Sequence, residues 1–287
     1  MYDTGYPKDV VDAGEAANFI LALQGQQQTR AAGWGMRDPR SILITGASSG
    51  IGAALARSYA APQRHLALTG RNIERLAEVA AACRALGATV TEGIVDACDK
   101  EASARFVAAA ESVSPLDLVI ANAGISGGTY HGETPEQTRE ILSVNMDGVL
   151  NTILPAIPLL QSRRRGQIAI MSSLASFRGF PGAPAYCASK AAVRIWGEAL
   201  RGDLRPYGIG VCVICPGFVV SRMTAKNRFR MPLLMPAERA AELIRAGLAQ
   251  NRARIAFPFR MYFGAWLMGA LPPGLTDPLL KRLPKKE

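Results

Sequence analysis

The sequence predicts an α/β protein in which helices cover both faces of a parallel sheet. Short apolar runs typical of buried strands recur along the chain, and segments with the periodicity of amphipathic helices separate them. Strands that alternate with helices form βαβ units. Their right-handed crossovers produce a doubly wound sheet with its binding site at the carboxyl ends of the strands.

Nothing between Ser41 and Phe257 resembles a linker, so we expect one domain over residues 41–258. The expected strands are Ser41–Thr45, His65–Thr69, Thr89–Val95, Asp117–Ala121, Gln167–Met171, Ile209–Cys215 and Arg254–Phe257. The expected helices are Ile51–Ala60, Ile73–Leu86, Lys100–Ser112, Pro135–Leu160, Pro184–Leu204 and Ala237–Gln250. We expect residues 1–40 to form an extension without strands. Met36 is a second candidate start site, so the native protein either includes residues 1–35 or lacks them.

Composition excludes several classes of protein. With 287 residues, 49% hydrophobic and 20% charged, the chain is long enough for a full core and too apolar to be intrinsically disordered. The net charge is +10, but thirteen basic and only four acidic residues lie from Arg222 onward. The remainder is nearly neutral, so the charge does not by itself indicate a nucleic-acid-binding protein.

Cysteine usage indicates a reducing compartment, because the chain has five cysteines, an odd number, and their spacing is not that of a disulfide framework. Cys212 and Cys215 lie within one expected strand, where residues three apart face opposite ways, so we interpret them as structural.

The first 35 residues lack the pattern of a secretory signal. The uncharged stretch Met261–Thr276 is too short to span a bilayer and contains two prolines. We therefore expect a cytoplasmic protein, with peripheral membrane contact left open.

A glycine-rich turn joins the first expected strand to the first helix, in the run Thr45-Gly46-Ala47-Ser48-Ser49-Gly50-Ile51-Gly52. Glycines permit a tight turn, and they let backbone N–H groups at a helix N-terminus approach a pyrophosphate. The turn therefore indicates a nucleotide site.

This run resembles the nucleotide-binding motif of the short-chain dehydrogenase/reductase family. The resemblance continues in order over about 170 residues, through Asn122-Ala123-Gly124, Asn145, Ser172-Ser173, Tyr186-Cys187-Ala188-Ser189-Lys190 and Pro216-Gly217. It implies a Rossmann-type sheet of seven strands in the order 3-2-1-4-5-6-7. It also implies an oxidoreductase that acts on CH–OH or C=O groups with NAD(P).

The resemblance assigns the cofactor-binding residues. Those implied are Gly46, Ser48, Ser49, Gly50, Ile51 and Gly52 at the pyrophosphate, Asp96 at the adenine, Asn122, Ala123 and Gly124 at the ribose, Tyr186 and Lys190, and Pro216, Gly217, Val219 and Ser221 at the nicotinamide. Family members usually have Thr at the position of Ser221, and the hydroxyl is retained here.

The end of the second strand bears on the choice of nucleotide. An NAD site places a carboxylate there to accept a hydrogen bond from the ribose 2′-OH. This chain has Gly70-Arg71 instead, and a guanidinium suits a 2′-phosphate. We therefore expect NADP(H) to be preferred, with NAD(H) still usable. The alternative is that Arg71 is a solvated residue at a strand end.

Tyr186 and Lys190 lie four residues apart on one expected helix, so their side chains share a face. A nearby ammonium is expected to lower the pKa of the phenol toward neutral pH. The resemblance implies that Tyr186 is the general acid or base for hydride transfer at the nicotinamide C4 position. It further implies that Ser173 binds the reacting oxygen and that Asn145 supports a proton relay through Lys190. The chain has only two histidines and no third ligand near either, so we expect no metal site.

Two segments are expected to determine the substrate, the Gly-rich loop Ile125–Glu133 and a lid at about 221–236. The lid mixes apolar residues with Arg222, Lys226 and other cations, which suits a lipophilic substrate or one with an anionic handle such as a coenzyme A thioester. A mobile lid that does not select charge is the alternative. The basic, apolar tail 259–287 either folds back over the domain or lies on a membrane surface.

The family resemblance implies a homodimer or homotetramer, formed through the helices Pro135–Leu160 and Pro184–Leu204. The leading hypothesis is an NADP(H)-dependent alcohol dehydrogenase or carbonyl reductase with a small-molecule substrate. The competing hypothesis is a non-enzymatic NADP(H)-binding protein that senses redox state or binds a partner. Nucleic-acid binding lacks a recognisable module in the sequence.

Overall fold

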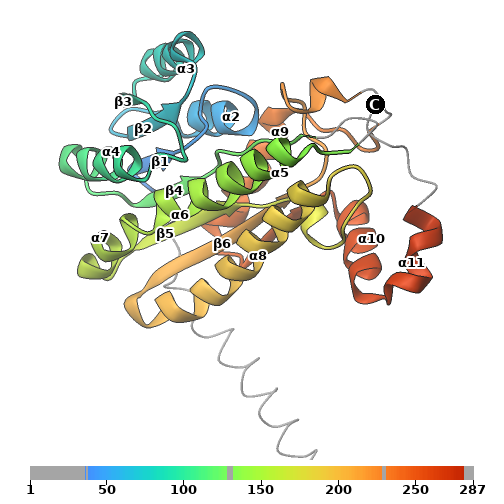
Figure 1. Ribbon diagram of the computed structural model, residues 1–287. Coiled ribbons are helices and arrows are strands. Elements are labelled where there is room, and N and C mark those ends of the chain that lie inside the picture. The colour runs from blue at the N-terminus through green and yellow to red at the C-terminus, as the bar shows by residue number, and fades with distance from the viewer. Residues whose placement is uncertain (1–35, 37, 128–131, 228–230, 281–287) are drawn as a thin grey trace, which may run out of the picture. The chain divides into compact units, whose positions relative to one another are not determined.

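The computed structural model describes Met36 and residues 38–127, 132–227 and 231–280. In these residues a sheet of seven parallel strands has the expected order β3-β2-β1-β4-β5-β6-β7 (Figure 1). The strands are β1 Ser41–Ile44, β2 His65–Gly70, β3 Thr89–Ile94, β4 Leu118–Ala121, β5 Gly166–Met171, β6 Ile209–Pro216 and β7 Arg254–Phe257. The prediction of a Rossmann-type fold is confirmed.

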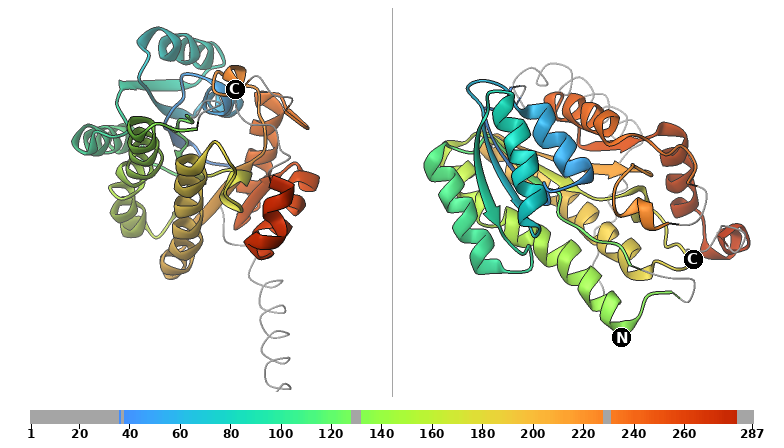
Figure 2. Two further views of the ribbon diagram at one scale, coloured as in Figure 1. Left: turned by 45° about the vertical axis from the view of Figure 1, so that its right-hand side comes forward. Right: turned by 90° about the horizontal axis from the view of Figure 1, so that it is seen from above.

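Helices cover both faces of this sheet (Figures 1 and 2). They are α2 Gly50–Tyr59, α3 Ile73–Ala85, α4 Lys100–Val113, α5 Pro135–Leu142, α6 Gly148–Ile153, α7 Ala156–Arg163, α8 Pro184–Leu204, α9 Ala237–Ala249, α10 Phe259–Ala270 and α11 Pro273–Leu280. Parallel strands covered on both sides are expected to be apolar throughout, and β1, β4 and β6 are buried along their whole length.

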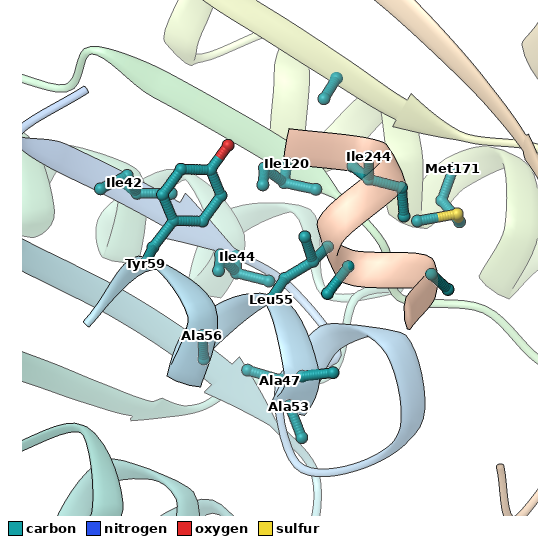
Figure 3. Packing of buried hydrophobic residues seen from close by; sticks show 14 of the residues in the cluster. Ile42, Ile44, Ala47, Ala53, Leu55, Ala56, Tyr59, Ile120, Met171 and Ile244 are labelled. Atoms are coloured by element: carbon teal, nitrogen blue, oxygen red, sulfur yellow. The ribbon is translucent and has the colours of Figure 1, made fainter. Parts of the chain in front are cut away.

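Successive residues of β1 face opposite sides of the sheet and belong to different cores. Ile42 and Ile44 pack with residues of α2 and α9, whereas Leu43 packs with residues of α4 and α7. Figure 3 shows the first of these cores, where Leu55 and Tyr59 of α2 lie over the strand residues. This packing fixes α2, and with it the glycine turn that precedes α2.

The single helix expected over Pro135–Leu160 is wrong. The segment is divided into α5, a π-helical turn over Ser143–Asp147, α6 and α7. Pro155 precedes α7 and has no N–H to donate to the preceding turn, which explains the break between α6 and α7. The π turn carries Asn145, and such turns occur often at functional sites.

Three expected features lie wholly or partly outside the described residues. These are most of the N-terminal extension, part of the Gly-rich loop including His131, and the basic end of the tail. In the lid, Arg228, Phe229 and Arg230 also lie outside them, as does the side chain of Lys226.

Candidate active site

The glycine turn between β1 and α2 is held by close backbone packing. Gly46 has φ +66°, and a Cβ there would lie 2.8 Å from the Cα of Ala123. A Cβ on Gly52 would lie 2.3 Å from the carbonyl oxygen of Gly46. Both positions therefore require glycine. The N-cap residue of α2, Ser49, makes no side-chain capping hydrogen bond, and the first turn of α2 contains no acidic residue.

Asn122 ties the end of β4 to this turn. Its side-chain amide donates to the carbonyl oxygens of Thr45, at 2.9 Å, and Gly46, at 3.2 Å. The hydroxyl of Thr45 in turn accepts from the backbone N–H groups of Asn122 and Ala123. The Asn122 side-chain amide therefore shapes the turn.

The end of β2 places two arginines beside the same turn. Arg71 is exposed, and Arg75 follows in the first turn of α3, whose N-cap Asn72 accepts from the Arg75 N–H at 2.9 Å. The Nε of Arg75 is buried and has no hydrogen-bond partner among the described residues. Arg75 is not among the cofactor-binding residues expected from the sequence. The sequence nevertheless contains a signal for it. Arg75 is a cation in the first turn of a helix, where the helix dipole favours anions, and this combination indicates an anion-binding site.

Ser173, Tyr186 and Lys190 come together where β5 ends against α8. The Ser173 side chain lies close enough to the Tyr186 hydroxyl to influence its pKa. The Nζ of Lys190 lies 6.0 Å from the centre of the Tyr186 ring and donates to the carbonyl oxygen of Met171 at 3.0 Å. Ser172, which precedes Ser173, anchors the strand end by donating to the carbonyl oxygen of Lys190.

Burial is the largest cause of the pKa shifts of Tyr186 and Lys190. It raises the pKa of Tyr186, an effect that the Ser173 side chain only partly offsets. It lowers the pKa of Lys190 to about 8. The predicted lowering of the Tyr186 pKa is not seen, because burial raises this pKa instead. The raised pKa keeps the phenol protonated at neutral pH.

Asn145 reaches the same place from the π turn. Its side chain exchanges hydrogen bonds with the backbone of Ile125, at 2.8 Å and 3.0 Å, and donates to the Ser189 hydroxyl. A Cβ on Gly124 would lie 3.0 Å from Asn145 Oδ1 and 3.2 Å from Lys190 Nζ. Gly124 therefore lies directly against both side chains, and a larger residue would displace them.

Glu133 caps the helix that carries Tyr186. Its carboxylate accepts from the N–H of Ala185 at 2.6 Å and from the N–H of Tyr186 at 3.3 Å. The N-cap residue of α8, Ala183, has no side-chain capping bond. From the sequence, Glu133 is expected only at the end of a loop. Its hydrogen bond with Ala185 joins residues more than 50 positions apart and therefore has no local signature.

The remaining predicted residues lie at the ends of β3 and β6. The N–H of Gly217 donates to the Phe257 carbonyl at 2.7 Å, and Val219 forms a bridge with Met235. Ser221 is hydrogen-bonded to Thr224, and Asp96 accepts from the N–H of Cys98 at 2.9 Å. These contacts hold the segments that follow β3 and β6 in place.

A cavity of about 1440 Å³ connects these parts. Of the predicted site residues, all but Gly52 and Asn145 line it, and these two lie behind Gly46 and Gly124. The wall farthest from the glycine turn is apolar and includes Leu174, Phe180, Met261, Ala265 and Met268. Three of these five belong to α10, so the tail forms part of the cavity.

Cys212, Cys215 and His65 have contacts typical of residues that stabilise the fold. Cys212 and Cys215 are buried and unpaired, and they belong to different hydrophobic cores, as expected of a structural pair. His65 is hydrogen-bonded to Ser41 and Thr91. The described part of the chain contains no cluster of potential metal ligands. It also has no helix long and apolar enough to cross a bilayer.

A comparison with family models matches residues 40–231 to the short-chain dehydrogenase family. The chain belongs to this family. An oxidoreductase of Myxococcus xanthus is 37% identical over 246 residues, covering 85% of this chain and 97% of the relative. The ketoacyl reductase HetN of Nostoc is 31% identical, over 68% of this chain and 69% of HetN.

Solved structures of the family share the fold. A short-chain dehydrogenase from Mycobacterium paratuberculosis, bound to NAD, superimposes with a TM-score of 0.67 at 23% identity, over 76% of this chain and 94% of the other. Levodione reductase gives the same TM-score at 22% identity. Membership of the family makes this chain an oxidoreductase of the short-chain dehydrogenase type.

Proposed function

We propose that the protein is an NADP(H)-dependent oxidoreductase that interconverts a ketone or aldehyde and the corresponding alcohol. The observation that carries this proposal is the convergence of Ser173, Tyr186 and Lys190 on the wall of the cavity that the glycine turn also lines. A proton donor beside a nucleotide-sized cavity is what carbonyl reduction requires.

The residues present fit a dinucleotide. A Cβ at Gly46 or Gly52 would collide with backbone, so the turn stays narrow, and the start of α2 offers N–H groups without a side-chain cap. Gly46, Ser48, Ser49, Gly50 and Ile51 would hold the pyrophosphate. When bound, the cofactor supplies the hydride.

The chain's own residues supply the proton and the orientation. Tyr186, protonated at neutral pH, donates to the carbonyl oxygen of the substrate. Ser173 hydrogen-bonds the same oxygen as negative charge develops on it. Lys190 places a cation beside the Tyr186 ring, and Asn145 holds Ile125 next to this group.

Preference for NADP(H) rests on Arg71 and Arg75. Both line the cavity, as does Ser48, and Nε of Arg75 is buried with no partner in the described part of the chain. A 2′-phosphate would supply such a partner. The test compares dissociation constants for NADPH and NADH, and tighter NADH binding would contradict this assignment.

The substrate is lipophilic or carries an anionic handle. The apolar wall from α10 supports the first property, and Arg222, which also lines the cavity, supports the second. A 3-ketoacyl thioester has both, and a relative is described as a ketoacyl reductase. A panel of aliphatic ketones, acyl thioesters, sugars and steroids tests the class. If NADPH binds but no carbonyl is turned over, the non-enzymatic alternative is favoured.

Assembly into a dimer or tetramer is also proposed. Leu154, which follows α6, and Ile195 of α8 are 53% and 55% exposed in the single chain, so these helices present apolar side chains for an isologous contact. Sedimentation velocity measures the assembly. A reducing, cytoplasmic location is consistent with five free cysteines.

A further inference from the structure

Helix α10 has two apolar faces, and the described parts of the chain cover only one of them. Met261, Tyr262 and Ala265 pack against the core at the end of the sheet. Gly269 lies so close to η2 (Leu174–Ser176) that its Cβ would be 2.1 Å from the Phe177 carbonyl oxygen. These contacts fix one side of α10 against the domain.

The other face of α10 carries large aromatic side chains exposed to solvent. Phe259, Phe263 and Trp266 are 73%, 51% and 46% exposed. Their rings form a continuous row, with centroids 6.4 Å apart for the first pair and 6.1 Å for the second. Leu267 of α10, Leu271 directly after it and Leu275 of α11 are also exposed. Contiguous apolar surface of this kind marks an interaction site.

The segment that carries this row is basic in sequence. Arg260 of α10 is exposed, and Asp277, the acidic residue of α11, is paired with Arg178 at 2.7 Å. Lys281, Arg282, Lys285 and Lys286 follow in the sequence, against a single acid, Glu287. A segment that combines an exposed apolar face with a net positive charge complements a surface that is apolar inside and anionic at its boundary. A second copy of this chain would instead bring like charges together.

We propose that the outer face of α10 binds the surface of an anionic lipid bilayer. Aromatic side chains favour the boundary between headgroups and acyl chains, and basic residues add attraction to anionic lipids. With 12 residues, α10 is too short to span a bilayer and lies in the plane of its surface.

This surface lies next to the cavity, since Met261, Ala265 and Met268 of α10 line the cavity wall. A bilayer on the outer face would hold the cavity beside a reservoir of lipid-soluble molecules. This extension to substrate supply rests on the proposed function, whereas lipid binding itself does not.

The test is co-sedimentation of the full chain with vesicles of phosphatidylcholine, either alone or with phosphatidylglycerol. We expect binding to the anionic vesicles that weakens as salt is raised. The double variant Phe263→Ser/Trp266→Ser should bind the anionic vesicles at least about tenfold more weakly, because the substitutions remove a large apolar area. Leu86→Ser is the matched control, because Leu86 is also 51% exposed but lies after α3.

Tryptophan fluorescence gives a second measurement. Vesicles should shift the emission to shorter wavelength, and Trp266→Phe should abolish that shift. Thermal unfolding by circular dichroism checks that each variant is folded. Equal vesicle binding by the parent and the double variant would overturn the proposal. So would an absence of lipid binding together with self-association that the double variant abolishes, which would make this face a contact between copies.

Discussion

The carboxylate of Glu133 accepts a hydrogen bond from the backbone N–H of Ala185, the residue before Tyr186, at 2.6 Å. A loop on the substrate side of the cavity thereby fixes the start of the helix that carries the proposed proton donor. The negative charge is also favourable there, because it faces the positive end of the helix dipole.

Replacing Glu133 with Ala should therefore disturb Tyr186 without affecting the cofactor site. We expect kcat to fall by about tenfold and the free energy of unfolding by about 1 kcal/mol, the usual cost of a lost cap. The dissociation constant for NADPH should not change. Glu133→Gln retains an acceptor and should recover part of kcat, and Glu136→Gln, at an exposed position nearby, is the control. Equal losses of kcat and of cofactor affinity would argue against a positioning role.

Arg75→Gln should weaken NADPH binding by about tenfold, as expected for one lost charge-assisted hydrogen bond, and leave NADH binding unchanged. Fluorescence titration of both nucleotides measures this. Arg84→Gln, on the same helix but paired with Glu92, should change neither constant. Equal weakening of both nucleotides would show that Arg75 does not contact the 2′-phosphate.

The pH dependence of reduction should follow Lys190. Its cation is present below a pKa of about 8 and is lost as the pH rises through that value, whereas Tyr186 stays protonated to higher pH. The kcat/KM for carbonyl reduction should therefore decline above about pH 8. Lys190→Arg keeps its charge and should remove the decline even if its rate is lower. A parent profile that is flat to about pH 10 would contradict this assignment.

Two glycines should respond oppositely to substitution by alanine. Gly46→Ala should destabilise the protein by about 1–3 kcal/mol, because the residue has a positive φ and a close backbone neighbour. Gly202→Ala, within α8 and with no atom near its Cβ position, should be neutral or stabilising by about 0.5–1 kcal/mol. Urea unfolding measures both. A stable Gly46→Ala protein with unchanged NADPH affinity would show that the turn tolerates a side chain.

The strands, the glycine turn and the shared helical face of Tyr186 and Lys190 could be predicted from local signals: apolar runs, the spacing of glycines and a four-residue helical spacing. The order of the strands and the place of Ser173 beside Tyr186 were implied only by the resemblance to the short-chain dehydrogenase/reductase family. The break at Pro155 also had a local signal, which the helical periodicity around it obscured.

The missed features depend on distant contacts or on burial. Glu133 caps α8 only because the fold brings a loop to that helix. The tail, by contrast, follows one of its two expected arrangements, since α10 folds back against η2 and lines the cavity. The raised pKa of Tyr186 follows from burial, which the helical spacing of Tyr186 and Lys190 does not reveal.

The measurement that tests the central claim most directly is the turnover and NADPH affinity of Tyr186→Phe. This variant keeps the ring and removes the proton donor. The proposed chemistry predicts a loss in kcat of about a thousandfold, within the range for general acid catalysis, and a dissociation constant for NADPH within about twofold of the parent. A variant that reduces the same carbonyl at the parent's rate would contradict the assignment of Tyr186 as the proton donor.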